Sequence, residues 1–101
     1  MTNFGMVGKL QASAENRDAL ADILSQASEL MQSEEGCRLY VVSKDADDDT
    51  TVWVMELWDS KEAHDDSLKR EDVRALIAQA MPLLIGAPDG ASLLPIAGKG
   101  L

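Results

Sequence analysis

The sequence predicts an α+β fold in which an antiparallel sheet has helices packed on one face. Apolar residues recur at helical spacing in some segments, and other short segments are rich in β-branched and aromatic residues. These segments follow the order strand, helix, strand, strand, helix, strand, which is typical of the ferredoxin-like βαββαβ fold. A length of 101 residues predicts a single domain over residues 1–101.

The first half of the chain contains one predicted strand and one long predicted helix. Residues 4–11 are apolar and precede a polar stretch, which indicates a strand. In residues 15–33 the apolar side chains recur at steps of three and four, so they share one face of a helix. We expect the Ser13 hydroxyl to cap the start of this helix, and Gly36 to end it in a left-handed conformation.

The second half is predicted to form a hairpin, two helices and a last strand. Residues 37–43 and 51–58 are rich in Val, Thr, Tyr and Trp, and the acidic link between them is too polar to be buried. Residues 61–68 predict a short helix and residues 72–84 a longer one, which Pro82 bends or ends. Residues 92–97 are the predicted last strand, in which Pro95 has to lie at an edge or a bulge.

The strand predicted over residues 51–58 is apolar on both faces. Trp53, Met55 and Leu57 alternate with side chains that are also apolar, apart from Glu56. An antiparallel sheet with one face in water alternates polar and apolar residues instead. We therefore expect helices to cover one face and a second copy of the chain to cover the other, which makes the protein a homodimer.

Charge and composition exclude several classes of partner and compartment. A net charge of −9 disfavours nucleic acid, whose binding depends on clustered Lys and Arg. No apolar run approaches the roughly 18 residues of a membrane helix, so no membrane association is expected. A single cysteine, Cys37, and the lack of a secretion signal favour the cytoplasm.

No motif in the sequence predicts a metal site. Phosphate loops, Ser-His-Asp arrangements and clusters of His and Cys are all missing. Asp45, Asp47, Asp49 and Glu56 match the spacing of a calcium loop, but Thr50 stands where that loop requires glycine. We interpret the match as accidental.

Three segments carry a resemblance to a known family: Glu34-Glu35-Gly36-Cys37, the run Val54-Met55-Glu56-Leu57-Trp58-Asp59-Ser60, and Glu62-Ala63-His64. With these segments the chain resembles the antibiotic biosynthesis monooxygenase family. The resemblance implies a dimeric α/β barrel of ferredoxin-like subunits, each with a pocket between helices and sheet. It also implies oxidation of a small aromatic molecule, a phenol or quinol, by dioxygen with no bound cofactor.

The resemblance also implies site residues. It makes Glu56 and His64 candidate catalytic residues, and it suggests a substrate-binding role for Trp58, Tyr40, Asn3 and Ser67. Many relatives have a histidine where this chain has Ser67, so His64 is displaced by nearly one helical turn. Each residue has a structural alternative: Glu56 pairs with Arg38 or caps a backbone group, Trp58 is core, and His64 is a surface residue.

The leading hypothesis is a cofactor-independent monooxygenase in which Trp58 shapes the pocket and Glu56 or His64 takes a proton. The first alternative is a non-catalytic, ligand-binding or sensory homodimer, because one fold serves many functions. The second is a structural dimer, in which the protein's own side chains would fill the pocket.

Overall fold

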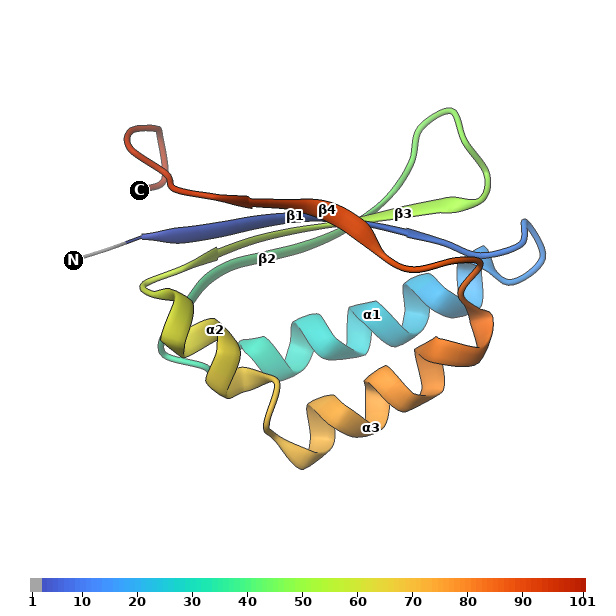
Figure 1. Ribbon diagram of the computed structural model, residues 1–101, viewed down its shortest axis with the longest axis horizontal. Coiled ribbons are helices and arrows are strands. Elements are labelled where there is room, and N and C mark those ends of the chain that lie inside the picture. Colours follow the sequence, from blue (N-terminus) through green and yellow to red (C-terminus); the bar gives the residue numbers. More distant parts are fainter. Residues whose placement is uncertain (1–2) are drawn as a thin grey trace.

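The computed structural model describes residues 3–101 and has the predicted fold (Figure 1). The sheet is open and has four antiparallel strands: β1 (Phe4–Gln11), β2 (Cys37–Lys44), β3 (Thr51–Trp58) and β4 (Asp89–Leu93). Their order across the sheet is β2-β3-β1-β4. The helices α1 (Arg17–Met31), α2 (Lys61–Ser67) and α3 (Glu71–Ala80) lie on one side of it. The ferredoxin-like α+β prediction is confirmed, and the sheet of this single chain is not closed into a barrel.

The register of the sheet brings three side chains from three strands together. Glu56 on β3 is opposite Met6 on β1 and Tyr40 on β2. Because side chains alternate along a strand, Glu56 faces the same way as its second neighbours Val54 and Trp58, which are buried on the helix side. The alternation predicted from the sequence for this strand is therefore confirmed.

Helix α1 is shorter at both ends than the sequence pattern indicates, and both expected caps are wrong. The backbone carbonyl of Ser13, not its hydroxyl, accepts hydrogen bonds from the amides of Asn16 and Arg17, at 2.9 and 3.0 Å. Gly36 lies five residues beyond the end of α1 and does not have a positive φ angle. A Cβ atom on Gly36 would lie 2.7 Å from the Cβ of Ala63, so glycine is required there for the close approach of α2.

In the C-terminal part, the helix predicted over residues 72–84 ends earlier, before Pro82, and the last strand also begins earlier than predicted. Helix α3 stops at Ala80, and Pro82 lies in the 3-10 turn η1 (Met81–Leu83) that follows, because proline lacks the amide that would continue the helix. Strand β4 spans Asp89–Leu93 instead of residues 92–97, so Pro95 lies beyond it. Gly90 allows the early start: its φ is +151°, and a Cβ there would overlap the carbonyl of Val7 on β1.

The core consists of two clusters at opposite ends of the helix layer. The first contains Ala12, Leu20, Ala21, Val52 and Ala80, and the second contains Phe4, Met31, Trp58 and Val73. Leu20, Val52 and Trp58 have no exposed surface, and burying each large apolar side chain stabilises the fold by about 1.5–3 kcal/mol. Members of both clusters line the cavity that lies between them.

All three helices lie on one side of the sheet, and no helix of residues 3–101 covers its other face (Figure 1). Leu39, Met55 and Leu93, from three different strands, are 46%, 41% and 46% exposed. We call this surface the outer face. Within the same residues, no helix is both long enough and apolar enough to cross a bilayer.

Candidate active site

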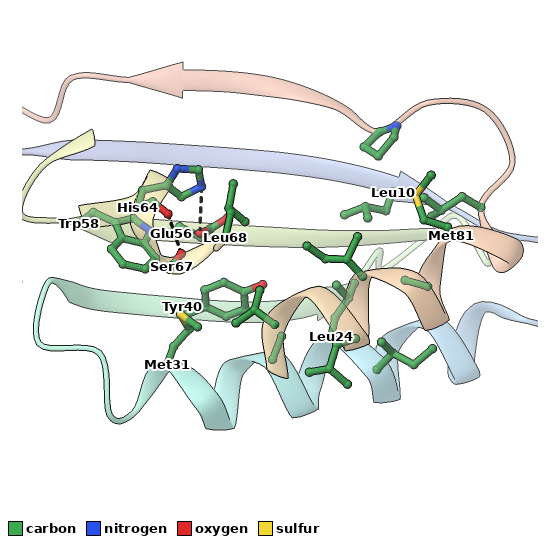
Figure 2. Close-up of a pocket in the computed structure, with 18 residues that line it drawn as sticks. Leu10, Leu24, Met31, Tyr40, Glu56, Trp58, His64, Ser67, Leu68 and Met81 are labelled. Atoms are coloured by element: carbon green, nitrogen blue, oxygen red, sulfur yellow. Dashed lines mark hydrogen bonds and ion pairs between the residues drawn. The ribbon is translucent and has the colours of Figure 1, made fainter. Parts of the chain in front are cut away.

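A cavity of about 220 Å³ lies between the helices and the inner face of the sheet (Figure 2). Most of its walls are aliphatic and come from α1, α3 and the strand ends, among them Leu10, Ile23, Leu24, Ala27, Leu76, Ile77, Ala80, Met81 and Leu84. Pockets for drug-sized ligands usually measure roughly 300–1,000 Å³. A ligand of this cavity is therefore small, with about one or two rings.

The polar side chains of the cavity gather at one end, beside α2 (Figure 2). Glu56 and Trp58 face this end because they are two residues apart on β3. Helix α2 begins three residues after β3, where the Ser60 hydroxyl caps it by accepting a hydrogen bond from the Ala63 amide at 3.1 Å. The chain turns sharply at this cap, and the first turn of α2 brings His64 close to Glu56.

Glu56 is a mostly buried carboxylate, with 14% of its side chain exposed, and it has two neighbours at this end. The Trp58 indole donates a hydrogen bond from Nε1 to Glu56 Oε1 at 3.0 Å, and His64 Nε2 lies 3.9 Å from the same oxygen. Burial raises the pKa of Glu56, although the Trp58 hydrogen bond and, when His64 is protonated, the charge of its ring act in the opposite direction. Arg38 is not its partner, because that guanidinium contacts Asn3 and Asp59.

His64 is buried, with only 9% of its surface exposed, so its interpretation as a surface residue is wrong. Its ring packs against Phe4 and against the edge of Trp58, with ring centroids 5.4 and 5.5 Å away. On the opposite edge of the ring, Nδ1 lies 3.0 Å from Asp65 Oδ1. A hydrogen bond from Lys61 lowers the pKa of Asp65, which keeps this carboxylate ionised.

The other predicted site residues lie in different places. Tyr40 lines the cavity, and burial together with the Glu56 charge raises its pKa, so it remains a neutral phenol. Ser67 also lines the cavity, but its hydroxyl donates to the His64 carbonyl at 2.6 Å. Asn3 does not line this cavity, and its Oδ1 accepts a hydrogen bond from Arg38 at 3.0 Å.

Asp65 is the site residue that sequence reasoning missed. Neighbouring side chains on a helix do not normally face one another, so the pair His64 and Asp65 gives no signal in the sequence. The contact forms because the buried His64 ring directs Nδ1 outward, toward the carboxylate of the next residue.

Residues 3–101 contain no cluster of three His, Cys, Asp or Glu side chains that could hold a metal ion. The acidic loop after β2 uses its carboxylates internally. Asp45 Oδ1 accepts hydrogen bonds from the amides of Asp47 and Asp48, whereas Glu56 points into the cavity. Burial raises the pKa of the Cys37 thiol to about 11, so this cysteine is a poor nucleophile at neutral pH.

A model of the antibiotic biosynthesis monooxygenase family matches residues 3–79, which include both strands and the helix that form the polar end of the cavity. The chain belongs to the antibiotic biosynthesis monooxygenase family. The resemblance inferred from three short segments is thereby confirmed. No curated protein matches the sequence closely enough to count as a relative.

Solved structures support membership of the antibiotic biosynthesis monooxygenase family. A candidate antibiotic biosynthesis monooxygenase from Chloroflexus aurantiacus J-10-fl is 36% identical, with a TM-score of 0.84 and 95% of each chain covered. A protein of unknown function from Nitrosomonas europaea is 26% identical, with a TM-score of 0.82 and coverage of 98% of this chain and 94% of that one. A candidate family member from Caulobacter crescentus CB15 shares the fold at 22% identity, with a TM-score of 0.86 and coverage of 95% and 92%.

Proposed function

We propose that the protein is a cofactor-independent monooxygenase that oxidises a small phenolic or quinol-type aromatic with dioxygen. One observation carries the proposal: a mostly buried carboxylate, an imidazole and an indole meet at one end of a cavity whose other walls are largely aliphatic. Family membership supports oxygenase chemistry, and the cavity supports a small apolar substrate with a polar head.

In the proposed reaction the substrate supplies all the electrons. Glu56 or His64 takes the proton of a ring hydroxyl, and the resulting phenolate reduces dioxygen and forms a carbon–oxygen bond at a ring carbon. That carbon loses its hydrogen as a proton, and the O–O bond breaks. One oxygen atom stays as a quinone carbonyl and the other leaves as water. Phenol and O2 thus give quinone and H2O, with four electrons passing from the ring to dioxygen.

The walls of the cavity have a defined part in this proposal. Aliphatic side chains exclude water, which strengthens electrostatic interactions inside and protects the reactive phenolate from solvent protons. Trp58 is fully buried, and its indole N–H donates a hydrogen bond to Glu56. It therefore both orients the candidate base and shapes the pocket. Apart from the substrate and dioxygen, the chain itself provides every group that the proposed steps require.

We further propose that the protein works in the cytoplasm as a homodimer whose subunits pack through the outer face. Leu39, Met55 and Leu93 give this face an apolar surface across three strands. An exposed apolar patch of this kind is typical of an interface, because single soluble chains rarely present one. The face is also on the side away from the cavity, so dimerisation leaves the substrate site in each subunit intact.

The test measures oxygen consumption by metal-free protein with small phenols, catechols and dihydroxynaphthalenes. We expect uptake that depends on the substrate, with one O2 used per quinone formed. Glu56→Gln or His64→Ala should lower turnover by about 10²- to 10⁴-fold, which is the usual contribution of a positioned acid or base. The matched control Glu62→Gln changes an exposed glutamate on α2 and should leave turnover unchanged. Full turnover in both site variants would refute the assigned residues.

The second candidate function is a homodimer that binds a small ligand without oxidising it. The observation that favours it is Ser67: the family resemblance implies a histidine at this position, and the Ser67 hydroxyl is already bonded within α2. Saturable binding of the same aromatics with no oxygen uptake would support this function. A purely structural dimer is disfavoured, because the protein's own side chains leave the cavity unfilled.

A further inference from the structure

Two hydrogen-bond acceptors face the same space at the polar end of the cavity. Glu56 Oε1 and His64 Nε2 are 3.9 Å apart, which is too far for a hydrogen bond between them. Both side chains are mostly buried, with 14% and 11% of their surfaces exposed. A bound molecule that donates to both atoms at once would therefore satisfy two groups that the protein leaves only partly bonded.

The contact with Asp65 determines which nitrogen of His64 carries the proton. Asp65 Oδ1 lies 3.0 Å from Nδ1, and Lys61 Nζ lies 2.7 Å from the other oxygen of the same carboxylate. An ionised carboxylate only accepts hydrogen bonds, so Nδ1 must donate. In the neutral ring Nε2 is then the acceptor. Packing against Phe4 and Trp58 keeps the ring in this orientation, with Nε2 toward Glu56.

We infer that the site binds a catechol, an aromatic ring with two adjacent hydroxyl groups and a hydrocarbon remainder, and that Asp65 is a positioning residue for this recognition. One hydroxyl donates to the Glu56 carboxylate and the other to His64 Nε2. The inference makes the proposed function more specific. It depends on that function only for the claim that the bound catechol is also oxidised.

The spacing of the hydroxyl groups distinguishes a catechol from its isomers. A single hydroxyl has one proton and can donate to only one of the two acceptors. Adjacent hydroxyls lie within hydrogen-bond distance of each other and can span acceptors 3.9 Å apart. The oxygens of a 1,3 arrangement are farther apart than the two acceptors, and those of a 1,4 arrangement lie at opposite ends of the ring. When one hydroxyl of either isomer meets Glu56, the other is therefore displaced from His64 Nε2.

The opposite end of the cavity favours a hydrocarbon tail. Leu10 on β1 is opposite Val52 on β3. Val52 is four residues from Glu56, so the two positions on β3 are roughly 13 Å apart at about 3.3 Å per residue. Figure 2 shows Leu10 and Met81 at this end, away from Glu56 and His64. A hydroxyl buried among these side chains has no partner, and an unpaired hydroxyl weakens binding.

The experiment measures binding without oxygen, so that it does not depend on turnover. Under anaerobic conditions 4-butylcatechol is titrated beside 4-butylresorcinol, butylhydroquinone and 4-butylphenol, which share its tail. We expect 4-butylcatechol to bind at least about tenfold more tightly than each of the other three compounds, because each of those leaves one buried acceptor unpaired. In the untagged protein His64 is the only histidine, so its two ring nitrogens can be assigned directly by ¹⁵N NMR. Nδ1 should be the protonated one.

Two variants of α2 isolate the role of Asp65. Asp65→Ala should abolish the preference for the catechol and allow both tautomers of His64. Asp66→Ala removes the same charge from an exposed neighbour that pairs with Lys69, and should change neither property. Equal binding of the isomers by the unaltered protein, or a proton on Nε2, would overturn the inference. Preferred catechol binding without oxygen uptake would overturn the proposed function alone, and equal oxidation of all four compounds would overturn the inference alone.

Discussion

Replacing Trp58 with phenylalanine tests the hydrogen bond that holds the carboxylate of the site. Trp58 has no exposed surface, and its Nε1 donates to Glu56 Oε1 at 3.0 Å. A hydrogen bond to a charged group contributes about 1.5–3 kcal/mol, and the smaller ring leaves a void that costs about 1 kcal/mol more. We expect Trp58→Phe to lower the free energy of unfolding by about 2.5–4 kcal/mol.

The assay is urea unfolding followed by circular dichroism, with all variants at the same protein concentration because the protein is proposed to dimerise. The same substitution is then made in a Glu56→Gln background, where the acceptor is an uncharged amide oxygen. Hydrogen bonds between neutral groups contribute only about 0.5–1.5 kcal/mol. The penalty of Trp58→Phe should therefore be about 1 kcal/mol smaller in that background.

The pH dependence provides an internal control for this prediction. Because burial raises the pKa of Glu56, its carboxylate becomes protonated at a higher pH than that of an exposed glutamate, about 4.3. As the pH falls through this raised value, the charged acceptor is lost and the penalty of Trp58→Phe should decrease. A penalty that is equal in both backgrounds and at every pH would refute the role assigned to the hydrogen bond.

Three further predictions follow from other parts of the fold. Glu56→Gln should stabilise the protein at neutral pH, because the raised pKa of Glu56 means that its ionisation opposes folding. In thermal unfolding, this gain in stability should disappear as the pH falls below the pKa of a glutamate in the unfolded chain. Gly36→Ala should lower the free energy of unfolding by about 1–3 kcal/mol through its clash with α2, whereas Gly8→Ala, whose added Cβ would meet its nearest atom at 3.9 Å, should cost little in the same urea titration. Met55→Lys on the outer face should dissociate the proposed dimer in sedimentation experiments, and Gln26→Lys on the exposed side of α1 should not; a dimer that survives Met55→Lys would contradict the proposed interface.

The sequence predicts those parts of the site that depend on local geometry. Period-two alternation in β3 is a property of the strand itself, so spacing alone predicts that Glu56 and Trp58 share one face of the sheet. Pro82 likewise ends α3 for a local chemical reason, the missing amide. Both predictions needed no knowledge of the rest of the molecule.

Predictions that depended on distant parts of the chain did less well. Gly36 looks like a helix cap in sequence, but its neighbour is Ala63, which is 27 positions away in the chain. The burial of His64 also depends on contacts with Phe4, which β1 brings beside α2. The start of β4 depends on how closely Gly90 can approach β1. In each case the decisive contact is tertiary, and a local pattern does not specify it.

Gly36 also affects the chemistry of the site, although it does not line the cavity. Its lack of a side chain lets α2 approach the start of β2 at Ala63, the residue directly before His64. The 3.9 Å separation of His64 Nε2 and Glu56 Oε1 therefore depends on how deeply α2 is seated. A displacement of α2 by one ångström would be enough to change which ligand can donate to both acceptors, because active-site geometry tolerates errors of only about 0.5 Å. The close packing at Gly36 thus links the stability of the α2 contact to the selectivity that we propose for the site.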